Sequence, residues 1–175
     1  LPLTDELRAK IRALDEAMLE RIAGQDEAID AVHRVIKRQA TGVGNPDKPV
    51  GVFLFLGPTG VGKTELAKTC SEVLGWPMKR FDMSEFRDDA AANRFIGAAP
   101  GYVGYERGGE LTNFLFNNQR SVVVFDEFEK ANPKISEVLL QVFDEGRLTD
   151  GQGRTTLNGR GAIFIMTSNL GASLY

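Results

Sequence analysis

The sequence predicts an α/β fold, in which helices cover both faces of a mostly parallel central sheet. Three apolar runs, at residues 51–56, 121–125 and 162–167, support this prediction, and segments with helical periodicity separate them. Apolar runs of this length without polar alternation are typical of strands buried on both faces of a sheet. Because α/β sheets bind ligands beyond the carboxyl ends of their strands, any site should lie at that edge.

The composition suits one globular domain and disfavours several classes of protein. With 175 residues, of which 42% are hydrophobic, the chain is long enough to bury a core. A net charge of −3 gives no overall electrostatic signature of nucleic-acid binding, although it does not exclude a local basic patch, and no apolar run approaches the roughly 20 residues of a membrane helix. The amino terminus lacks the profile of a secretory signal, and the single cysteine, Cys70, fits a reducing compartment. We therefore expect a cytoplasmic protein without nucleic-acid or membrane partners.

The first fifty residues favour two helices and a loop. Residues 5–21 and 26–39 each show apolar side chains at helical spacing, and Gly24 lies between the two segments. The single histidine, His33, lies in the second segment without a catalytic companion, so we expect it to be structural. Residues 42–49, rich in Gly, Asn and Pro, predict a loop.

Strands and helices alternate from residue 51 onward. After the strand at 52–56, a helix is expected over 65–74, and its apolar face comprises Leu66, Ala67, Cys70, Val73 and Leu74. A second strand is expected at 78–83, followed by a partly helical polar stretch at 84–93. The glycine-rich residues 97–109 show little periodicity, and a helix is expected to resume over 110–116.

The last third of the chain continues the alternation. The strand at 121–125 is followed by a helix whose start is marked by Asn132 as the cap and Pro133 at the first position. An apolar face for this helix is formed by Ile135, Val138, Leu139, Val142 and Phe143. Residues 148–157 predict a β-hairpin, and 162–167 the last strand.

The segment Gly57–Thr64 has the phosphate-binding pattern G-x-x-x-x-G-K-T between a strand and a helix. In this pattern Lys63 reaches the β- and γ-phosphates, and the hydroxyl of Thr64 ligates Mg²⁺. Pro58, Thr59, Gly60, Val61 and Gly62 are expected to form the loop that binds the cofactor, with backbone N–H groups of the loop directed at the phosphates. The alternative is a glycine-rich turn with an incidental lysine. The pattern therefore predicts a site for a nucleoside triphosphate and Mg²⁺.

Two carboxylates follow the apolar strand at 121–125. Asp126 is placed to hold the metal through its water shell, and Glu127 to polarise the attacking water. Alternatively, the strand ends in a solvated acidic turn. Asn169, which follows the last strand, is placed to hydrogen-bond the γ-phosphate or the water, although an isolated Asn in that place is often a turn residue.

These motifs together resemble the AAA+ P-loop NTPases, and in particular the second ATPase module of the Clp/Hsp100 protein unfoldases. The resemblance covers the chain from about residue 22 onward. Its specific strings are residues 55–68, 82–86, 101–105, 146–154 and 165–171. It implies the large subdomain of an AAA+ ATPase over residues 1–175, without the helical lid and the trans-acting arginine finger, which lie further on in the family.

The same resemblance implies roles for further residues. Ile22 and Ala23 would line the adenine pocket, Asn169 would be sensor 1, and Tyr102 with Val103 would form a pore loop that grips polypeptide. A tight turn whose Tyr102 packs on its own domain is the alternative for that loop. The implied cofactors are ATP and Mg²⁺, and the implied partners are unfolded or aggregated polypeptides and further copies of the same chain in a ring, expected to be a hexamer.

The expected function is ATP hydrolysis that drives the threading of polypeptide through a ring. The isolated chain is expected to bind nucleotide with little hydrolysis, since an arginine finger contributes several orders of magnitude in rate to P-loop enzymes. Three alternatives remain open at this point: a nucleotide-dependent assembly switch, the ATPase subunit of a Clp-type protease, and a nucleic-acid motor, which the acidic composition disfavours.

Overall fold

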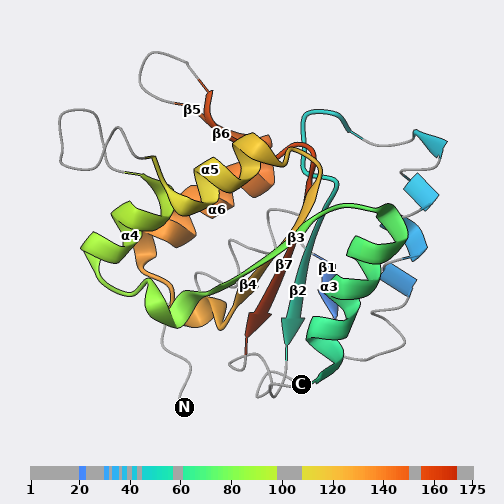
Figure 1. The fold of residues 1–175 in the computed structure, drawn as a ribbon, viewed down its shortest axis with the longest axis horizontal. Coiled ribbons are helices and arrows are strands. Elements are labelled where there is room, and N and C mark those ends of the chain that lie inside the picture. Colours follow the sequence, from blue (N-terminus) through green and yellow to red (C-terminus); the bar gives the residue numbers. More distant parts are fainter. Residues whose placement is uncertain are drawn as a thin grey trace.

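The computed structural model describes residues 20–22, 30–31, 33–35, 37–38, 41–42, 45–56, 61–97, 108–149 and 155–168. A five-stranded sheet forms its centre, in the order β1-β2-β7-β4-β3 (Figure 1). Every neighbouring pair in this sheet is parallel. The strands are β1 (Glu20–Ile22), β2 (Gly51–Leu56), β3 (Met78–Asp82), β4 (Ser121–Asp126) and β7 (Ala162–Ser168). The predicted α/β class with a parallel sheet is confirmed.

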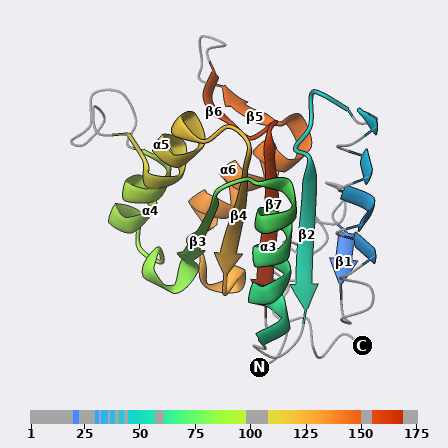
Figure 2. The same ribbon diagram turned by 45° about the vertical axis from the view of Figure 1, so that its right-hand side comes forward.

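Helices cover the two faces of the sheet unequally (Figure 2). One face packs against α3 (Val61–Leu74) and the helical residues near 31–35. The opposite face packs against α4 (Asp89–Ile96), α5 (Glu110–Asn117) and α6 (Pro133–Glu145). Alternate residues of the buried strands serve the two layers, as the period of a β-strand requires. In β4, for example, Val122 and Val124 face α3, whereas Val123 and Phe125 face the other layer.

Aromatic rings fill the larger of the two cores. Phe125 and Phe164 stack at 5.8 Å between ring centroids, and Phe164 lies 5.2 Å from Phe143 of α6. Phe95 of α4 contacts Phe81 edge-on at 5.0 Å. These contacts join β4 to β7, and they join β7 to α6 and β3 to α4.

Local sequence signals explain several helix boundaries. Asn132 caps α6 by accepting a hydrogen bond from the Lys134 N–H, and Pro133 opens the helix, as predicted. The helix ends at Gly146, whose φ of 77° is left-handed, which glycine adopts without strain. The predicted hairpin is also confirmed, since β5 (Arg147–Thr149) pairs antiparallel with β6 (Thr155–Asn158). Its turn lies outside the described residues.

The prediction of a helix over residues 5–21 is wrong at its carboxyl end, because Glu20–Ile22 form strand β1. This strand lies beside β2 at one edge of the sheet, with Ile22 opposite Phe55. Three residues are too few to show strand alternation, and pairing with an open sheet edge outweighs a local helical pattern. The earlier part of that predicted helix lies outside the described residues.

Two further details of the helices differ from expectation. The P-loop helix begins at Val61, four residues before the predicted start. Within it, Ala67 and Cys70 are buried as expected, but Val73 is 58% exposed. At 100° per residue, positions 67, 70 and 74 share one side of the helix, whereas position 73 lies at its margin. Burial raises the pKa of the Cys70 thiol to about 11, which makes a packing role more credible than reactivity.

His33 is exposed on the helical segment near the amino terminus, which agrees with a solvated structural role. Within the described residues, no helix combines the length and the apolar character that crossing a membrane requires.

Candidate active site

Polar side chains meet where the central strands end. Asp82 lies opposite Asp126 in the β3–β4 pair. Phe125 lies opposite Met166 in the β4–β7 pair, so Asp126 and Thr167 are the next neighbours along those strands. Because Val124 and Ile165 face α3, the residues two positions later, Asp126 and Thr167, lie on that same side. The carboxylate predicted to hold the metal is therefore on the face of the sheet covered by the P-loop helix.

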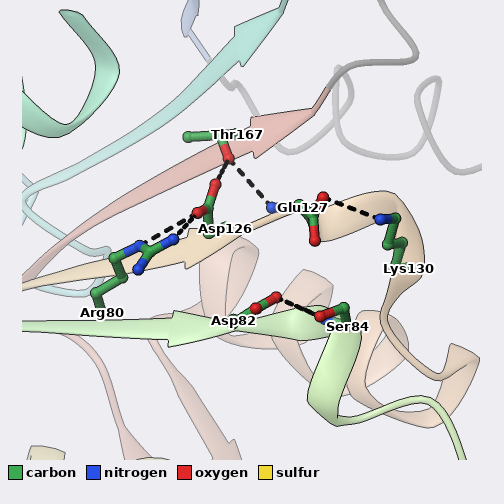
Figure 3. A network of polar contacts seen from close by, with 7 residues as sticks. All are labelled: Arg80, Asp82, Ser84, Asp126, Glu127, Lys130 and Thr167. Atoms are coloured by element: carbon green, nitrogen blue, oxygen red, sulfur yellow. Dashed lines mark hydrogen bonds and ion pairs between the residues drawn. The ribbon is translucent and has the colours of Figure 1, made fainter. Parts of the chain in front are cut away.

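Asp126 is held by donors from both neighbouring strands (Figure 3). Arg80 of β3 donates from Nε to Oδ2 at 3.2 Å, and its Nη2 also contacts Oδ2. Thr167 of β7 donates its hydroxyl to Oδ1. Burial by itself would raise the pKa of Asp126, but the hydrogen bonds from Thr167 and Arg80 outweigh it, and the pKa lies below its ordinary value. Asp126 is therefore a carboxylate at neutral pH.

Glu127 follows the end of β4 in a left-handed conformation, with φ 53° and ψ 50°. It is the one non-glycine residue with positive φ in the described part of the chain. Its N–H donates to the Thr167 hydroxyl at 3.1 Å, and its Oε1 accepts from Lys130 Nζ at 2.9 Å. A 3₁₀ turn, Phe128–Lys130, follows, and Phe128 is buried. Left-handed backbone at a non-glycine residue is a form of strain that accumulates at functional sites.

The backbone around the P-loop has the expected strand-to-helix arrangement. Strand β2 ends at Leu56 and α3 begins at Val61, so the motif spans the turn between them. Lys63 and Thr64 lie in the first turn of α3, where backbone N–H groups have no partner within the helix and favour a bound anion. The loop at 57–60, with Pro58, Thr59 and Gly60, and the side chains of residues 61–66 lie outside the description.

Four other predicted site residues are not described either. They are Ala23, Asn169 and the pore-loop residues Tyr102 and Val103. Ile22 is described only by its backbone, in β1 beside β2. The structure thus brings together Asp126 and Glu127, while the roles assigned to the other residues stay predictions.

The segment that contains Tyr102 is anchored closely at its two described ends. A Cβ atom at Gly109 would lie 2.4 Å from the backbone N of Gly97, so the two ends of the intervening segment touch through their backbones. Glycine is needed at position 109 because this approach leaves no room for a side chain. The residues that begin and end the predicted pore-loop segment, Gly97 and Gly109, therefore lie against each other.

Five residues of the network in Figure 3 had no role assigned from the sequence: Arg80, Asp82, Ser84, Lys130 and Thr167. Arg80 lies in a strand of mixed polarity, which gives no sign of the strand beside it. Thr167 precedes the predicted sensor Asn169 by two residues and ends an apolar run. A polar residue near the carboxyl end of an apolar strand is a signal that marks Thr167, but it does not identify Asp126 as the partner, and no such signal marks Arg80 in the middle of β3.

The donor chemistry fits a hydrated magnesium ion. Hard cations such as Mg²⁺ prefer oxygen ligands, and they retain waters beside one or two carboxylates and the substrate phosphates. The Asp126 side chain is 19% exposed, and its Oδ1, which accepts from Thr167, has a second lone pair, whereas Oδ2 already accepts two N–H groups of Arg80. Among the described residues, no three His, Cys, Asp or Glu side chains gather into a cluster that would hold a metal by itself.

Comparisons with known proteins show the family of the chain. Residues 48–175 match the family model described as AAA domain (Cdc48 subfamily). Similar proteins include those named chaperone protein ClpB from Lactiplantibacillus plantarum and Meiothermus ruber, each 52% identical over 170 residues. The protein of that name from Rhodopirellula baltica is 50% identical over 170 residues.

These alignments cover 95% of the chain but only about a fifth of each relative, namely 20%, 20% and 19% in the same order. The resemblance to the Clp/Hsp100 group is thereby confirmed over almost the whole sequence. The chain belongs to the AAA domain family, Cdc48 subfamily.

Proposed function

We propose that this chain is the ATP-binding and ATP-hydrolysing module of a Clp/Hsp100-type chaperone. The observation that carries the proposal is the position of Asp126 and Glu127. Asp126 ends the central strand β4 on the face covered by α3, the helix that begins inside the P-loop, and Glu127 follows directly. In P-loop ATPases the metal-holding carboxylate and the water-positioning residue act beside the loop that surrounds the phosphates.

The proposed roles follow from the chemistry of each group. Lys63 binds the β- and γ-phosphates, and backbone N–H groups within residues 58–62 surround them. Thr64 and Asp126 hold Mg²⁺, Asp126 through water; when bound, the ion neutralises charge that develops on the phosphates. Ile22 and Ala23 border the adenine, and Asn169 contacts the γ-phosphate.

Glu127 is proposed to orient and polarise the attacking water. Its Oε1 accepts a hydrogen bond from Lys130 Nζ at 2.9 Å, which holds the carboxyl group beside the end of β4. Its side chain is 25% exposed, so water can reach it. The left-handed backbone at Glu127 turns the chain away from the strand direction immediately after Asp126, so the two carboxylates serve different partners.

The substrate proposed for the whole protein is unfolded or aggregated polypeptide. Tyr102 and Val103 would contact it from a loop whose two ends meet at Gly97 and Gly109. A pore requires a ring, so we propose that the chain works in a homo-oligomer, most simply a hexamer, in the cytoplasm. The name "chaperone protein" carried by the relatives supports this reading.

Nucleotide binding and turnover test the proposal separately. Titration of the 175-residue chain with a fluorescent ATP analogue and Mg²⁺ should show saturable binding. Lys63→Ala should abolish that binding, whereas the control Lys79→Ala, at an exposed position of β3, should leave it unchanged. In the full-length protein, Glu127→Gln should retain ATP binding and arrest phosphate release.

The chain alone is expected to release phosphate very slowly, because the arginine finger expected from a neighbouring subunit is worth about 10³–10⁵ in rate. Brisk phosphate release by a monodisperse monomer would contradict this part of the proposal. Unchanged nucleotide binding by Lys63→Ala would contradict the whole of it.

A further inference from the structure

Thr167 joins the two carboxylate residues of the site through one oxygen atom. Its hydroxyl donates to Oδ1 of Asp126 and accepts the N–H of Glu127 at 3.1 Å (Figure 3). The residue is only 4% exposed and lies in β7, directly beside the end of β4. The link therefore joins two strands through residues that are far apart in the sequence: Thr167 lies 40 residues after Glu127 and 41 after Asp126.

The direction of these two hydrogen bonds is fixed by chemistry. A hydroxyl has one proton to donate, and a backbone N–H can only donate. Since the Glu127 N–H is directed at Oγ1, the Thr167 proton is free to go to the carboxylate of Asp126, which only accepts. Threonine also has a restricted χ1 because its Cβ is branched, and burial limits it further. The oxygen is thus a rigid junction that cannot reverse its donor and acceptor roles while Asp126 is charged.

The junction acts together with a second donor to orient Asp126. Thr167 holds Oδ1 from β7, while Arg80 holds Oδ2 from β3 on the other side. A carboxylate held at both oxygens from opposite strands has little freedom to rotate. Of the two donors, Thr167 is buried and short, whereas the Arg80 side chain is 52% exposed and flexible. The fixed reference for the carboxylate plane is therefore the threonine hydroxyl.

The same oxygen also fixes where Glu127 begins. The N–H of Glu127 is the first backbone group beyond the strand, and its bond to Thr167 sets the direction in which the left-handed turn leaves the sheet. The direction of the Glu127 side chain depends on that turn. A displacement of the hydroxyl would consequently move the metal-holding carboxylate and the water-orienting carboxylate at the same time.

We propose that Thr167 is a positioning residue for ATP hydrolysis, which sets Asp126 and Glu127 in a fixed relation through its single hydroxyl. The inference rests on the proposed function, because it takes the roles of those two residues from it. Thr167 itself touches neither nucleotide nor water in this scheme. Its contribution should appear in the chemical step and in Mg²⁺-dependent binding, not in nucleotide binding without the metal.

The test compares Thr167→Val, which removes the hydroxyl and keeps the shape, with Thr167→Ser, which keeps the hydroxyl. In the full-length protein, kcat for phosphate release should fall about 10- to 100-fold in Thr167→Val, the range that one hydrogen bond to a charged group carries. Thr167→Ser should stay within about 3-fold of the unaltered protein. Thr112→Val is the matched control, because it removes a part-buried hydroxyl that donates to a backbone carbonyl, that of Ile96, on α5.

A binding measurement separates positioning from catalysis and from folding. The affinity for a fluorescent ATP analogue is titrated with Mg²⁺ and with a chelator. Thr167→Val should lose about 3- to 10-fold of affinity in Mg²⁺ and be unchanged within 2-fold in the chelator, because Asp126 acts only on the metal. An equal loss under both conditions would show a general structural role and would overturn the proposal.

The remaining outcomes are also decisive. If Thr167→Val matches Thr112→Val in kcat and in Mg²⁺-dependent affinity, the positioning role is wrong while the proposed function stands. If the unaltered protein neither binds nor hydrolyses ATP, the proposed function itself fails. Should Thr167→Val not fold, Thr167→Cys replaces it, since a thiol is a weak donor and acceptor of similar size. Turnover of Thr167→Cys equal to that of Thr167→Ser would then refute the inference.

Discussion

The left-handed backbone of Glu127 leads to a prediction that separates the needs of folding from those of function. Glu127→Gly and Glu127→Ala both remove the carboxylate and its ion pair with Lys130, and both retain the N–H that donates to Thr167. The two variants differ only in the Cβ atom, which alanine has and glycine lacks, and therefore in the cost of the left-handed backbone. With φ 53° and ψ 50°, any residue with a Cβ is strained at this position, whereas glycine is not.

The magnitude follows from two opposing terms. A left-handed conformation costs a residue with a Cβ roughly 1–2 kcal/mol. Glycine gains that amount but loses about 0.4–1 kcal/mol through the greater freedom of the unfolded chain. Glu127→Gly should therefore be more stable than Glu127→Ala by about 0.5–1 kcal/mol. For a domain of this size, about 2–4 °C of thermal midpoint corresponds to 1 kcal/mol, so the expected difference is about 1–4 °C.

The assay is thermal and urea unfolding of both variants, with the same pair of substitutions at Glu137 as the control. Glu137 is exposed in the interior of α6, where glycine is less stable than alanine by about 0.8–1 kcal/mol. The sign of the difference should thus be opposite at the two positions. Neither variant at position 127 should hydrolyse ATP in the full-length protein, although glycine improves its folding. If alanine were the more stable residue at position 127 as well, the strain argument would be refuted.

Three other predictions concern the core, the charge network and the buried thiol. Phe164→Ala should lower the free energy of unfolding by about 3–5 kcal/mol in urea titrations, because the ring is fully buried, while Phe116→Ala at an 81% exposed ring should change it little. Because Arg80 helps to hold the pKa of Asp126 below its ordinary value, the stability that Asp126 contributes is present above pH about 4 and is lost as the pH falls through the lower folded value. Arg80→Gln should therefore move acid unfolding, followed by circular dichroism, to higher pH. Burial raises the pKa of Cys70 from 9.0 to about 11, so the stability that the neutral thiol contributes is complete below pH 9 and is lost between pH 9 and 11. The free energy of unfolding of Cys70→Ala should therefore fall less over that pH range than that of the unaltered chain. Labelling of Cys70 by a thiol reagent at pH 8 should require unfolding.

The sequence was sufficient for the central strands, because their apolar runs are continuous and their ends are marked. Asp126 and Glu127 stand directly after such a run, and the structure places them at the end of β4. The start of α6 was predicted from Asn132 and Pro133, whose roles as cap and first residue depend only on neighbours along the chain. Signals of this local kind survive into the folded protein.

The polar network was not predictable, because it depends on which strands lie side by side. Arg80 reaches Asp126 only because β3 pairs with β4. Thr167 reaches it only because β7 lies between β2 and β4. Neither order follows from the spacing of residues along the chain. Strand β1 failed for a related reason, because three residues at a sheet edge take their conformation from the partner strand β2.

The strand order also explains why the last strand can carry a positioning residue. Strand β7 is bounded on one side by β2, which leads into the P-loop, and on the other by β4, which ends in Asp126. The Thr167 hydroxyl, near the carboxyl end of β7, is therefore a buried donor to the metal-holding carboxylate, and its own strand is paired on both sides. A donor on an edge strand, such as Arg80 on β3, has a partner strand on one side only and reaches Asp126 through a long, half-exposed side chain. The threonine is thus better suited than the arginine to define the geometry, and the arginine to supply the opposing charge.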